Sequence, residues 1–286
     1  MTGFSIDWLD LREAADQRAR DDSLLEQASY WLETTSASWT DPAVVDLGAG
    51  TGSTLRAFSK SSLFSQPPQS SHSSQFLRWR LVDQDEALLG EARRRHGSSQ
   101  QLDTYQLDLT DIAALPLEGA RLITASALFD LVSADFIDML ATTLQSRCQQ
   151  PQAGVYAALN YDGTTHWTPA HPMDAAVLDA FNRDQQRDKG FGPALGPDAG
   201  AYMERQFNSL GFTVFSASSP WLLSGTDSEL VQALINGIGD AVAADPALDP
   251  AALQGWIRFR TAQLLTGTCR VGHSDLLALP QDQTGQ

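Results

Sequence analysis

Cysteine is scarce in this sequence, and long apolar runs are missing. The only cysteines are Cys148 and Cys269, which are too few for a disulfide framework and form no CxxC pair that would indicate a zinc site. No apolar run approaches the roughly 20 residues of a membrane-spanning helix. The N-terminal segment also lacks the basic start, apolar middle and cleavage site of a signal peptide. We therefore expect a cytoplasmic protein with two ordinary thiols.

Positive charge is also in short supply. The chain has 19 Lys and Arg against 35 Asp and Glu, which gives a net charge of −16. Because Lys and Arg drive binding to nucleic-acid phosphates, we expect no nucleic-acid partner. We expect a small-molecule substrate and no membrane partner, and the sequence leaves a homodimer open. Acidity on its own also keeps a protein soluble.

Hydrophobic periodicity predicts strands that alternate with helices. Apolar residues at helical spacing cover residues 5–35, with a break at Asp22-Ser23. A buried run at residues 43–47 then leads into a glycine-rich turn and a helix. Later strands are predicted at residues 77–82, 104–107, 122–126, 154–159, 212–216 and 272–279. This alternation favours a doubly wound, mostly parallel α/β sheet.

The strongest chemical signal is the segment VVDLGAGTG at residues 44–52. A buried strand ends in Asp46 and a turn whose glycines let the backbone approach a ligand where a Cβ would collide. Open α/β sheets bind ligands at the carboxyl ends of their strands. A dinucleotide fingerprint needs its third glycine at position 53, which is Ser53. A nicotinamide or flavin cofactor, or a purely structural turn, therefore remains only as an alternative.

The pattern Asp-x-Gly-x-Gly-x-Gly resembles the first motif of the class I S-adenosylmethionine (SAM)-dependent methyltransferases. The resemblance extends to about residue 159 and, loosely, to the last two strands. It implies that SAM is the cofactor and S-adenosylhomocysteine (SAH) the product. It also implies that the turn holds the cofactor through Asp46, Gly48, Ala49, Gly50 and Gly52.

Later segments fit the same family in order. Asp83, followed by Gln84, ends the second strand, where a carboxylate can accept both ribose hydroxyls. Asp85 is the alternative if the register is shifted. After the third strand, the resemblance implies that Asp108 accepts the adenine amino group and that Leu109 offers a backbone N–H to the ring.

Two further cofactor contacts are expected. Ser126 lies in the small-residue turn after the fourth strand, which in the resembling enzymes lies beneath the methionine part of the cofactor. An arginine from the N-terminal helices can pair with the cofactor carboxylate. Of Arg12, Arg18 and Arg20 we select Arg20, and a solvated helix face is the alternative for each.

The segment after the fifth strand is dense in polar and aromatic groups, and we expect the substrate there. Asn160, Asp162 and His171 are the expected substrate-binding residues. His166 is the first candidate for a general base, because histidine titrates near neutrality, and Tyr161 is the second. The spacing of these groups matches no metal-ligand pattern, so we expect no metal.

Together, the residues and the resemblance predict a SAM-dependent methyltransferase acting on a small organic molecule at O, N or C. The expected fold is a Rossmann-like, seven-stranded, mostly parallel sheet at residues 41–286 with an N-terminal helical cap at residues 1–40. Helical insertions around residues 163–197 and 225–268 are expected to build a lid. A protein-modifying methyltransferase and a non-catalytic SAM-binding protein remain as alternatives.

A second likeness adds no chemistry. Residues 11–13 and 188–197 look like segments of a group of bacterial methyltransferase-like proteins. No substrate is assigned to that group. The substrate therefore stays unassigned on the sequence alone.

Overall fold

The computed structural model describes residues 4–36, 42–60, 77–97, 101–147 and 153–281. The low-complexity segment at residues 61–75, which the sequence predicts to be a mobile surface loop, lies outside these ranges, as does Cys148. Among the described residues, no helix is long and apolar enough to cross a membrane.

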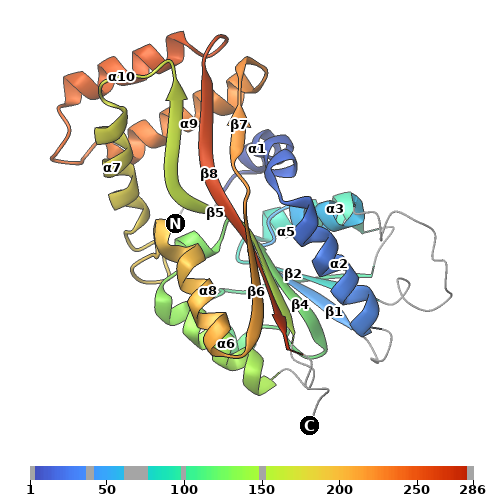
Figure 1. Ribbon diagram of the computed structural model, residues 1–286. Helices are drawn as coiled ribbons and strands as arrows, with labels where there is room; N and C mark the ends of the chain where they lie inside the picture. The colour runs from blue at the N-terminus through green and yellow to red at the C-terminus, as the bar shows by residue number, and fades with distance from the viewer. Residues whose placement is uncertain (1–3, 37–41, 61–76, 98–100, 148–152, 282–286) are drawn as a thin grey trace.

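A sheet of eight strands runs through the centre of the molecule (Figure 1). Its order is β3-β2-β1-β4-β5-β8-β6, and β7 pairs with the outer part of β8. Only β8 breaks the parallel pattern, because it is antiparallel to β5, β6 and β7. The strands are β1 (Ala43–Leu47), β2 (Arg78–Asp83), β3 (Leu102–Gln106), β4 (Ala120–Ser126), β5 (Gly154–Thr168), β6 (Phe212–Ser218), β7 (Trp221–Leu223) and β8 (Thr268–Pro280).

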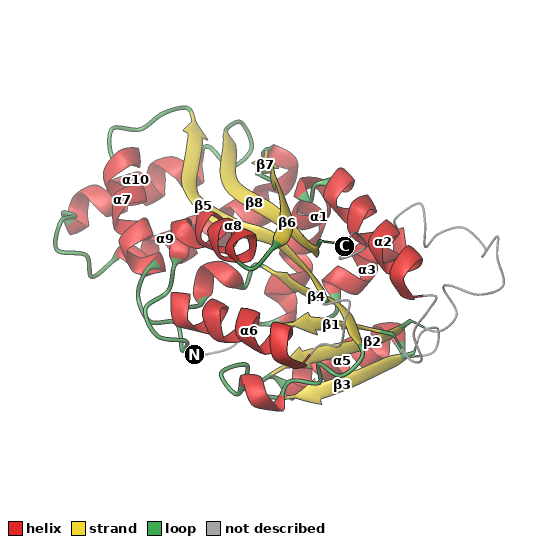
Figure 2. Ribbon diagram, turned by 60° about the horizontal axis from the view of Figure 1, so that its bottom comes forward, coloured by secondary structure: helices red, strands yellow, loops and turns green. Residues whose placement is uncertain are grey.

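Helices cover both faces of this sheet (Figure 2). The α-helices are α1 (Ile6–Ala19), α2 (Asp22–Ser36), α3 (Ser53–Lys60), α5 (Glu86–His96), α6 (Ala134–Arg147), α7 (Asp174–Gln185), α8 (Ala199–Ser209), α9 (Ser228–Val242) and α10 (Pro250–Ala262). Short 3-10 helices are η1 (Ile112–Ala114), η2 (Phe129–Leu131), η3 (Gly196–Asp198) and η4 (Gly225–Asp227). The doubly wound, mostly parallel architecture is therefore confirmed, and the short β7 is the strand that the sequence analysis missed.

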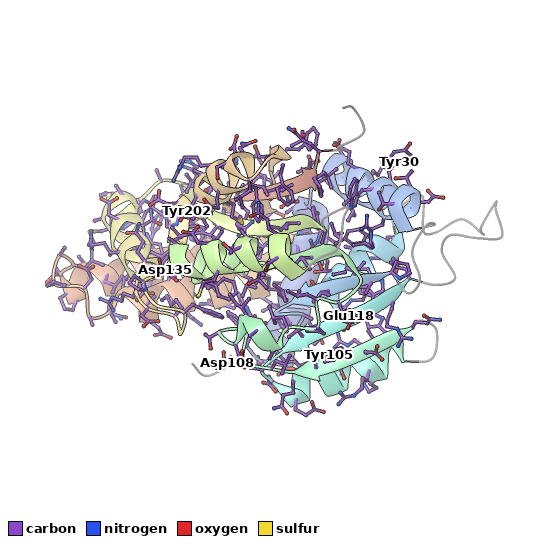
Figure 3. All side chains as sticks on the ribbon, turned by 90° about the horizontal axis from the view of Figure 1, so that it is seen from below. Tyr30, Tyr105, Asp108, Glu118, Asp135 and Tyr202 are labelled. Atoms are coloured by element: carbon purple, nitrogen blue, oxygen red, sulfur yellow. The ribbon has the colours of Figure 1, made fainter. Side chains whose placement is uncertain are left out.

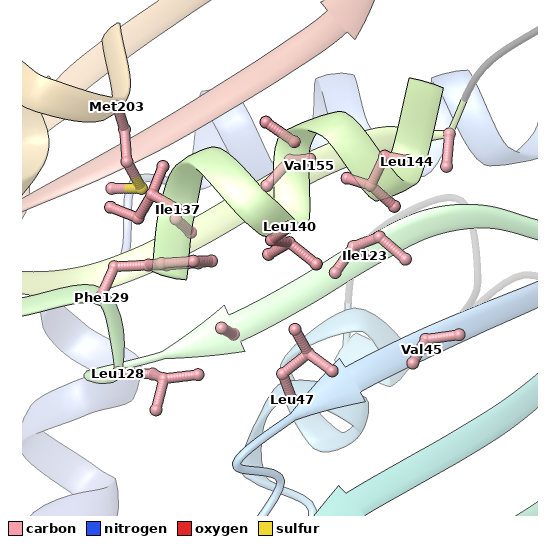
Figure 4. Close-up of a cluster of buried hydrophobic side chains, with 14 of the residues drawn as sticks. Val45, Leu47, Ile123, Leu128, Phe129, Ile137, Leu140, Leu144, Val155 and Met203 are labelled. Atoms are coloured by element: carbon pink, nitrogen blue, oxygen red, sulfur yellow. The ribbon is translucent and has the colours of Figure 1, made fainter. Parts of the chain in front are cut away.

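Two hydrophobic clusters hold the helices to the sheet. On one face, Val45 and Leu47 of β1 join side chains of β4, α6 and α8, and Figure 4 shows Leu140 of α6 among them. On the other face, Val44 joins side chains of α2, α3 and α5. Successive residues of a strand point to opposite faces, and β1 is buried on both. This burial explains its continuous apolar sequence.

Strands β5 and β8 are longer than the sequence predicts. They pair from Val155↔Ala278 as far as Thr168↔Thr268, with register shifts after Ala157 and after Tyr161. These β-bulges coincide with positive φ angles at Leu159 (58°) and Gly163 (84°). The bulges interrupt the alternation of side chains along β5. A prediction from that alternation therefore ends the strand at residue 159.

The extended part of β5 and β8 carries its own layer of helices. Helices α7, α9 and α10 gather around it at the end of the molecule away from β1 to β3 (Figure 1). They share a third hydrophobic cluster, centred on the fully buried Trp256 of α10 and Ile235 of α9. The two segments expected to form a lid thus pack together as one unit, and the role of that unit as a lid stays a prediction.

Candidate functional site

The glycine-rich turn lies where the order of the parallel strands reverses, between β2-β1 and β4. Open α/β sheets bind their ligands at such a switch point. Gly48, Gly50 and Gly52 have φ angles of 62°, 54° and 84°, which favour glycine over any residue with a side chain. A Cβ on Gly50 would also lie 3.0 Å from Leu9 Cδ1 of α1. Helix α1 therefore covers the turn at van der Waals distance.

Asp46 supports the turn from below. Its side chain is 1% exposed, and its Oδ1 accepts a hydrogen bond of 2.7 Å from Thr124 Oγ1. Its Oδ2 has no partner among the described residues. Burial raises the pKa of this carboxyl to about 7, although the nearby Thr124 and Arg20 oppose the shift. Asp46 thus places a buried carboxyl beneath the turn but does not line the cavity above it.

A cavity of about 150 Å³ opens above the turn and the carboxyl ends of the neighbouring strands. Seven of the residues predicted to bind the cofactor line it: Gly48, Gly50, Asp83, Gln84, Asp108, Leu109 and Ser126. An adjoining cavity of about 40 Å³ on the α1 side adds Ala49. Gly52, Asp46 and Arg20 line neither cavity. The structure therefore brings most of the predicted cofactor residues to one cleft.

Asp83 is the best-defined polar group in this cleft. The carboxylate is buried, and its Oδ2 and Oδ1 accept backbone N–H groups of Gly50 at 2.8 Å and Asp85 at 3.0 Å. Burial raises the pKa of Asp83, whereas these two hydrogen bonds oppose the shift. A carboxylate has about four acceptor positions, so two remain for a ligand. Asp85 also lines the cavity, but its Oδ1 caps α5 at Ala87 N.

Asp108 and Leu109 form the far end of the cleft, in the loop after β3. Asp108 is exposed, and Figure 3 shows it near Tyr105 of that strand. The backbone N–H and the Oγ1 of Thr110 donate to its Oδ1, at 2.9 and 2.7 Å, and lower its pKa. Leu109 is buried and, with Leu88 of α5, adds an apolar surface to the cleft. The apolar surface of Leu88 and Leu109, with the Asp108 carboxylate beside it, has a shape and polarity that suit a flat ring with one polar edge.

Arg20 reaches the site from the end of α1. It is 6% exposed, and its Nη2 donates to Ser126 Oγ at 2.9 Å. Its Nη1 has no hydrogen-bond partner among the described residues. Arg20 lines neither cavity, so its pairing with the cofactor carboxylate stays a prediction.

Helix α1 is held over the cleft by charged side chains from both sides. Arg56 of α3 binds Glu13 through Nε and Nη2, each at 2.6 Å. Arg95 of α5 binds Asp10 at 2.7 and 2.9 Å. On the other side, Arg18 pairs with Asp227 at 2.6 Å. Arg18 thus anchors the helix, away from the cofactor cleft.

The predicted general bases do not reach the cleft. His166 is exposed on the outer part of β5, opposite Arg270. At about 3.3 Å per residue, the stretch of β5 from Ala158 to His166 spans roughly 25 Å. Tyr161 is buried, donates its hydroxyl to Asn182 Oδ1 at 2.9 Å, and has its pKa raised by burial to about 12. Neither group is placed to take a proton beside the glycine-rich turn.

The predicted substrate residues are spread along the extended part of the sheet and its loop. Asn160 is fully buried and donates from Nδ2 to Ser274 O at 3.2 Å. The Oδ1 of Asp162 accepts the Thr164 N–H and hydroxyl within its own turn. The Nδ1 of His171 accepts the N–H of Met173. None of the three lines the two cavities.

Some residues of the site carried no clear signal in the sequence. Leu9 of α1, Leu88 of α5 and Leu128 line the cavity but look like ordinary core positions. Asp130 is 7% exposed just beyond β4, and the only hint of its burial is that it is a lone acid in the apolar run LFDLV. In the described part of the chain, no three potential His, Cys, Asp or Glu ligands converge on one point.

Comparisons with known proteins bear on the fold. A candidate type II methyltransferase from Anaeromyxobacter dehalogenans aligns over 92% of this chain and 99% of its own, with a TM-score of 0.50 and 15% identity. A candidate methyltransferase from Bacillus halodurans C-125 aligns over 91% and 99%, with a TM-score of 0.48 and 13% identity. No protein-family model and no curated protein matches the sequence. The first likeness shows that the chain has the fold of this class of methyltransferases.

Proposed function

We propose that the cleft binds SAM and that the protein transfers the methyl group of SAM to a small organic molecule at O, N or C. The observation that carries this proposal is the position of the buried Asp83 carboxylate. It bridges the glycine-rich turn at Gly50 and lines a cavity at the switch point of the sheet. An acidic acceptor beside left-handed glycines is suited to the two hydroxyls of a ribose.

The rest of the cleft fits the other parts of the cofactor. The apolar surfaces of Leu88 and Leu109, with Asp108 at the edge, suit an adenine ring. The turn at Gly48 to Gly50 suits the methionine part, and Arg20 Nη1 suits its carboxylate. Asp46, with a pKa near 7, becomes ionised most readily when a cation lies above it. SAM carries such a cation on its sulfonium.

Catalysis in this site needs alignment and the exclusion of water more than it needs a protein nucleophile. SAM, when bound, supplies a methyl group already activated by the positive charge on sulfur. The chain's own contribution is to orient two reactants and to close α1 over them. A cavity of about 150 Å³ is smaller than the roughly 300–1,000 Å³ typical of ligand sites. We therefore infer that α1 moves outward when the cofactor enters.

A small acceptor is favoured over a protein side chain. Leu9 and Arg12 of α1 and Phe191 of the loop before α8 enclose the cleft from above. A protein substrate would need an open groove leading to the transferred methyl group. The same enclosure does not exclude a protein that binds SAM without catalysis, and the two are separated by an assay for methyl transfer.

Calorimetric titration with SAM, SAH and NAD tests the proposal. We expect micromolar binding of SAM and SAH and no binding of NAD. Release of SAH from SAM in the presence of amine, alcohol and carboxylate acceptors then tests for transfer. Binding of NAD alone would show that the turn serves a dinucleotide. Binding of SAM with no transfer to any acceptor class would favour the non-catalytic alternative.

A further inference from the structure

A second group of buried polar atoms lies beside the cofactor cleft, on the face of α1 that packs against β7. Arg12, which lines both cavities, lies over the ring of Trp221 at 5.2 Å from its centroid. Asp16 accepts the Trp221 indole N–H at 2.9 Å. Arg12 also binds both Asp16 oxygens, from Nε at 2.8 Å and from Nη2 at 3.2 Å. The charge of Arg12 is therefore already compensated within α1.

Asp130 brings a carboxylate to the same place without such compensation. It lies between Leu128 and Leu131, which both line the cofactor cavity. Its side chain is 7% exposed, and its Oδ1 has no hydrogen-bond partner among the described residues. Burial raises its pKa to about 6, and a hydrogen bond from its own backbone N–H and the nearby charge of Arg12 oppose that shift. A buried carboxylate oxygen without a partner is costly unless a ligand satisfies it.

His273 of β8 supplies a second unfilled acceptor. It is 7% exposed, lies opposite Tyr161 in the β5–β8 pairing, and packs its ring 5.0 Å from that of Trp221. Burial lowers its pKa to about 3, so the imidazole is neutral. Its Nδ1 has no hydrogen-bond partner in the described part of the chain. In the neutral tautomer protonated at Nε2, Nδ1 is an acceptor.

Backbone strain marks the same edge of the sheet. Ala127 and Leu159 are the only non-glycine residues in the described ranges with positive φ, at 51° and 58°. They follow β4 and the first part of β5, and Ala127 N donates to Ala158 O at 2.9 Å. Strained non-glycine residues persist where the surroundings fix them and are common at functional sites. Asp130 comes three residues after Ala127, the first of these two strained residues.

These groups select a ligand by charge. Both unfilled atoms, Asp130 Oδ1 and His273 Nδ1, are acceptors, and one belongs to a carboxylate. The ring of Tyr161, which lies opposite His273 in the β5–β8 pairing, adds an aromatic surface that attracts cations. We propose that Asp130 binds the methyl acceptor of this protein and that the acceptor is a small amine, which enters as its ammonium ion. This inference rests on the proposed function.

Methyl transfer from SAM to such an amine requires the loss of one proton from the ammonium ion, and Asp130 can accept that proton. The ammonium ion gives one proton to the Asp130 carboxylate and becomes a neutral amine. The nitrogen lone pair then forms the N–CH₃ bond while the S–CH₃ bond breaks and its electron pair stays on sulfur, giving SAH. The methylated ammonium ion leaves, and Asp130 releases its proton to solvent. Asp130 thus contacts the acceptor and acts as its general base.

Binding of matched probes to the SAH-loaded protein tests this assignment. The probes are 2-phenylethylamine and butylamine, with 2-phenylethanol and butanol as uncharged counterparts, each followed by calorimetry. We expect at least one amine to bind at least tenfold more tightly than its alcohol. Asp130→Asn should weaken that amine at least tenfold and leave SAH affinity unchanged. Asp135→Asn, an exposed carboxylate on α6, is the control and should change neither.

The outcomes separate the two proposals. If SAH binds but neither amine is preferred over its alcohol, or if Asp130→Asn binds the amine as well as the wild type does, the amine assignment is wrong. If SAH itself fails to bind, the proposed function is wrong, and this inference, which rests on it, is wrong as well. Thermal unfolding without ligands checks the fold of the variant. Asp130→Asn should be at least as stable as the wild type, because it removes an unbalanced buried charge, and a large loss would indicate a structural role.

Discussion

At the scale of single residues, Asp83 makes the most direct prediction. Asp83→Ala removes the acceptor for the ribose hydroxyls, and unsatisfied buried groups of this kind cost about 1–3 kcal/mol each. We expect SAM affinity to fall by a factor of about 5–150 by calorimetry. Asp103→Ala, whose carboxylate pairs with Arg78 at the opposite end of β3, is the control. Unchanged SAM affinity in Asp83→Ala would remove Asp83 from the site.

The residues of the cofactor cleft could largely be predicted because each follows directly from a strand end. Gly50, Asp83, Asp108 and Ser126 all come at the carboxyl end of a parallel strand, where topology brings them to one edge. His166 could not be placed in this way. The sequence ends the strand at residue 159, whereas β5 continues and carries His166 away from that edge. Burial of Asp130 and His273 depends on tertiary packing, which no local pattern records.

At the scale of secondary-structure elements, our proposal makes α1 the part that moves when SAM enters or leaves. Its Asp10 and Glu13 are bound by Arg95 and Arg56, and these pairs must loosen when the helix moves outward. We expect the double variant Asp10→Asn, Glu13→Gln to speed SAM dissociation about 2–10-fold in stopped flow, since partly exposed ion pairs are weak and screened by salt. Glu86→Gln, which breaks the pair of Glu86 with Arg93 within α5, is the control for altered surface charge.

The salt dependence of the SAM dissociation rate tests whether these ion pairs hold α1. High salt should speed SAM dissociation from the wild type and have less effect on the double variant, because the pairs that salt screens are already gone. An equal salt effect on both proteins would show that α1 is not held by these charges. Hydrogen exchange should then also fail to show α1 as the first helix to open.

The elements themselves were well predicted where one periodicity held over the whole segment. β1 has the predicted bounds, and the helical segment predicted at residues 5–35 corresponds to α1 and α2, which begin at Ile6 and end at Ser36. β7 has only three residues and joins the sheet through the extended part of β8. Its position depends on a partner strand whose own length was hidden by the bulges of β5. Tertiary pairing, rather than local sequence, decides such edges.

At the scale of the whole molecule, buried carboxylates make stability depend on pH. The pKa of Asp46 is raised by burial from 3.8 to about 7, and that of Asp130 to about 6. The native state therefore holds these protons more tightly than the unfolded chain does. The stability they contribute is complete below about pH 4 and is lost as pH rises through 6 to 7. The cofactor-free protein should unfold more readily at pH 8 than at pH 5.

Chemical denaturation between pH 5 and pH 8 measures this effect. We expect a difference on the order of 2–4 kcal/mol in the free energy of unfolding, and Asp46→Asn should remove much of it. The net charge of −16 also favours unfolding at high pH, so the variant is needed to isolate Asp46. An unchanged slope in Asp46→Asn would show that this carboxyl is ionised throughout. Carboxyls with a lowered pKa, such as Asp108, stay ionised between pH 5 and pH 8 and do not contribute to the difference.

The central claim is that the cleft above the glycine-rich turn holds SAM with its adenine beside Asp108. Nuclear Overhauser contacts from the adenine protons of bound SAM to protein methyl groups test it most directly. We predict contacts to the methyl groups of Leu88 and Leu109, which line that end of the cavity. Contacts to methyl groups elsewhere, with none to these two residues, would contradict the account.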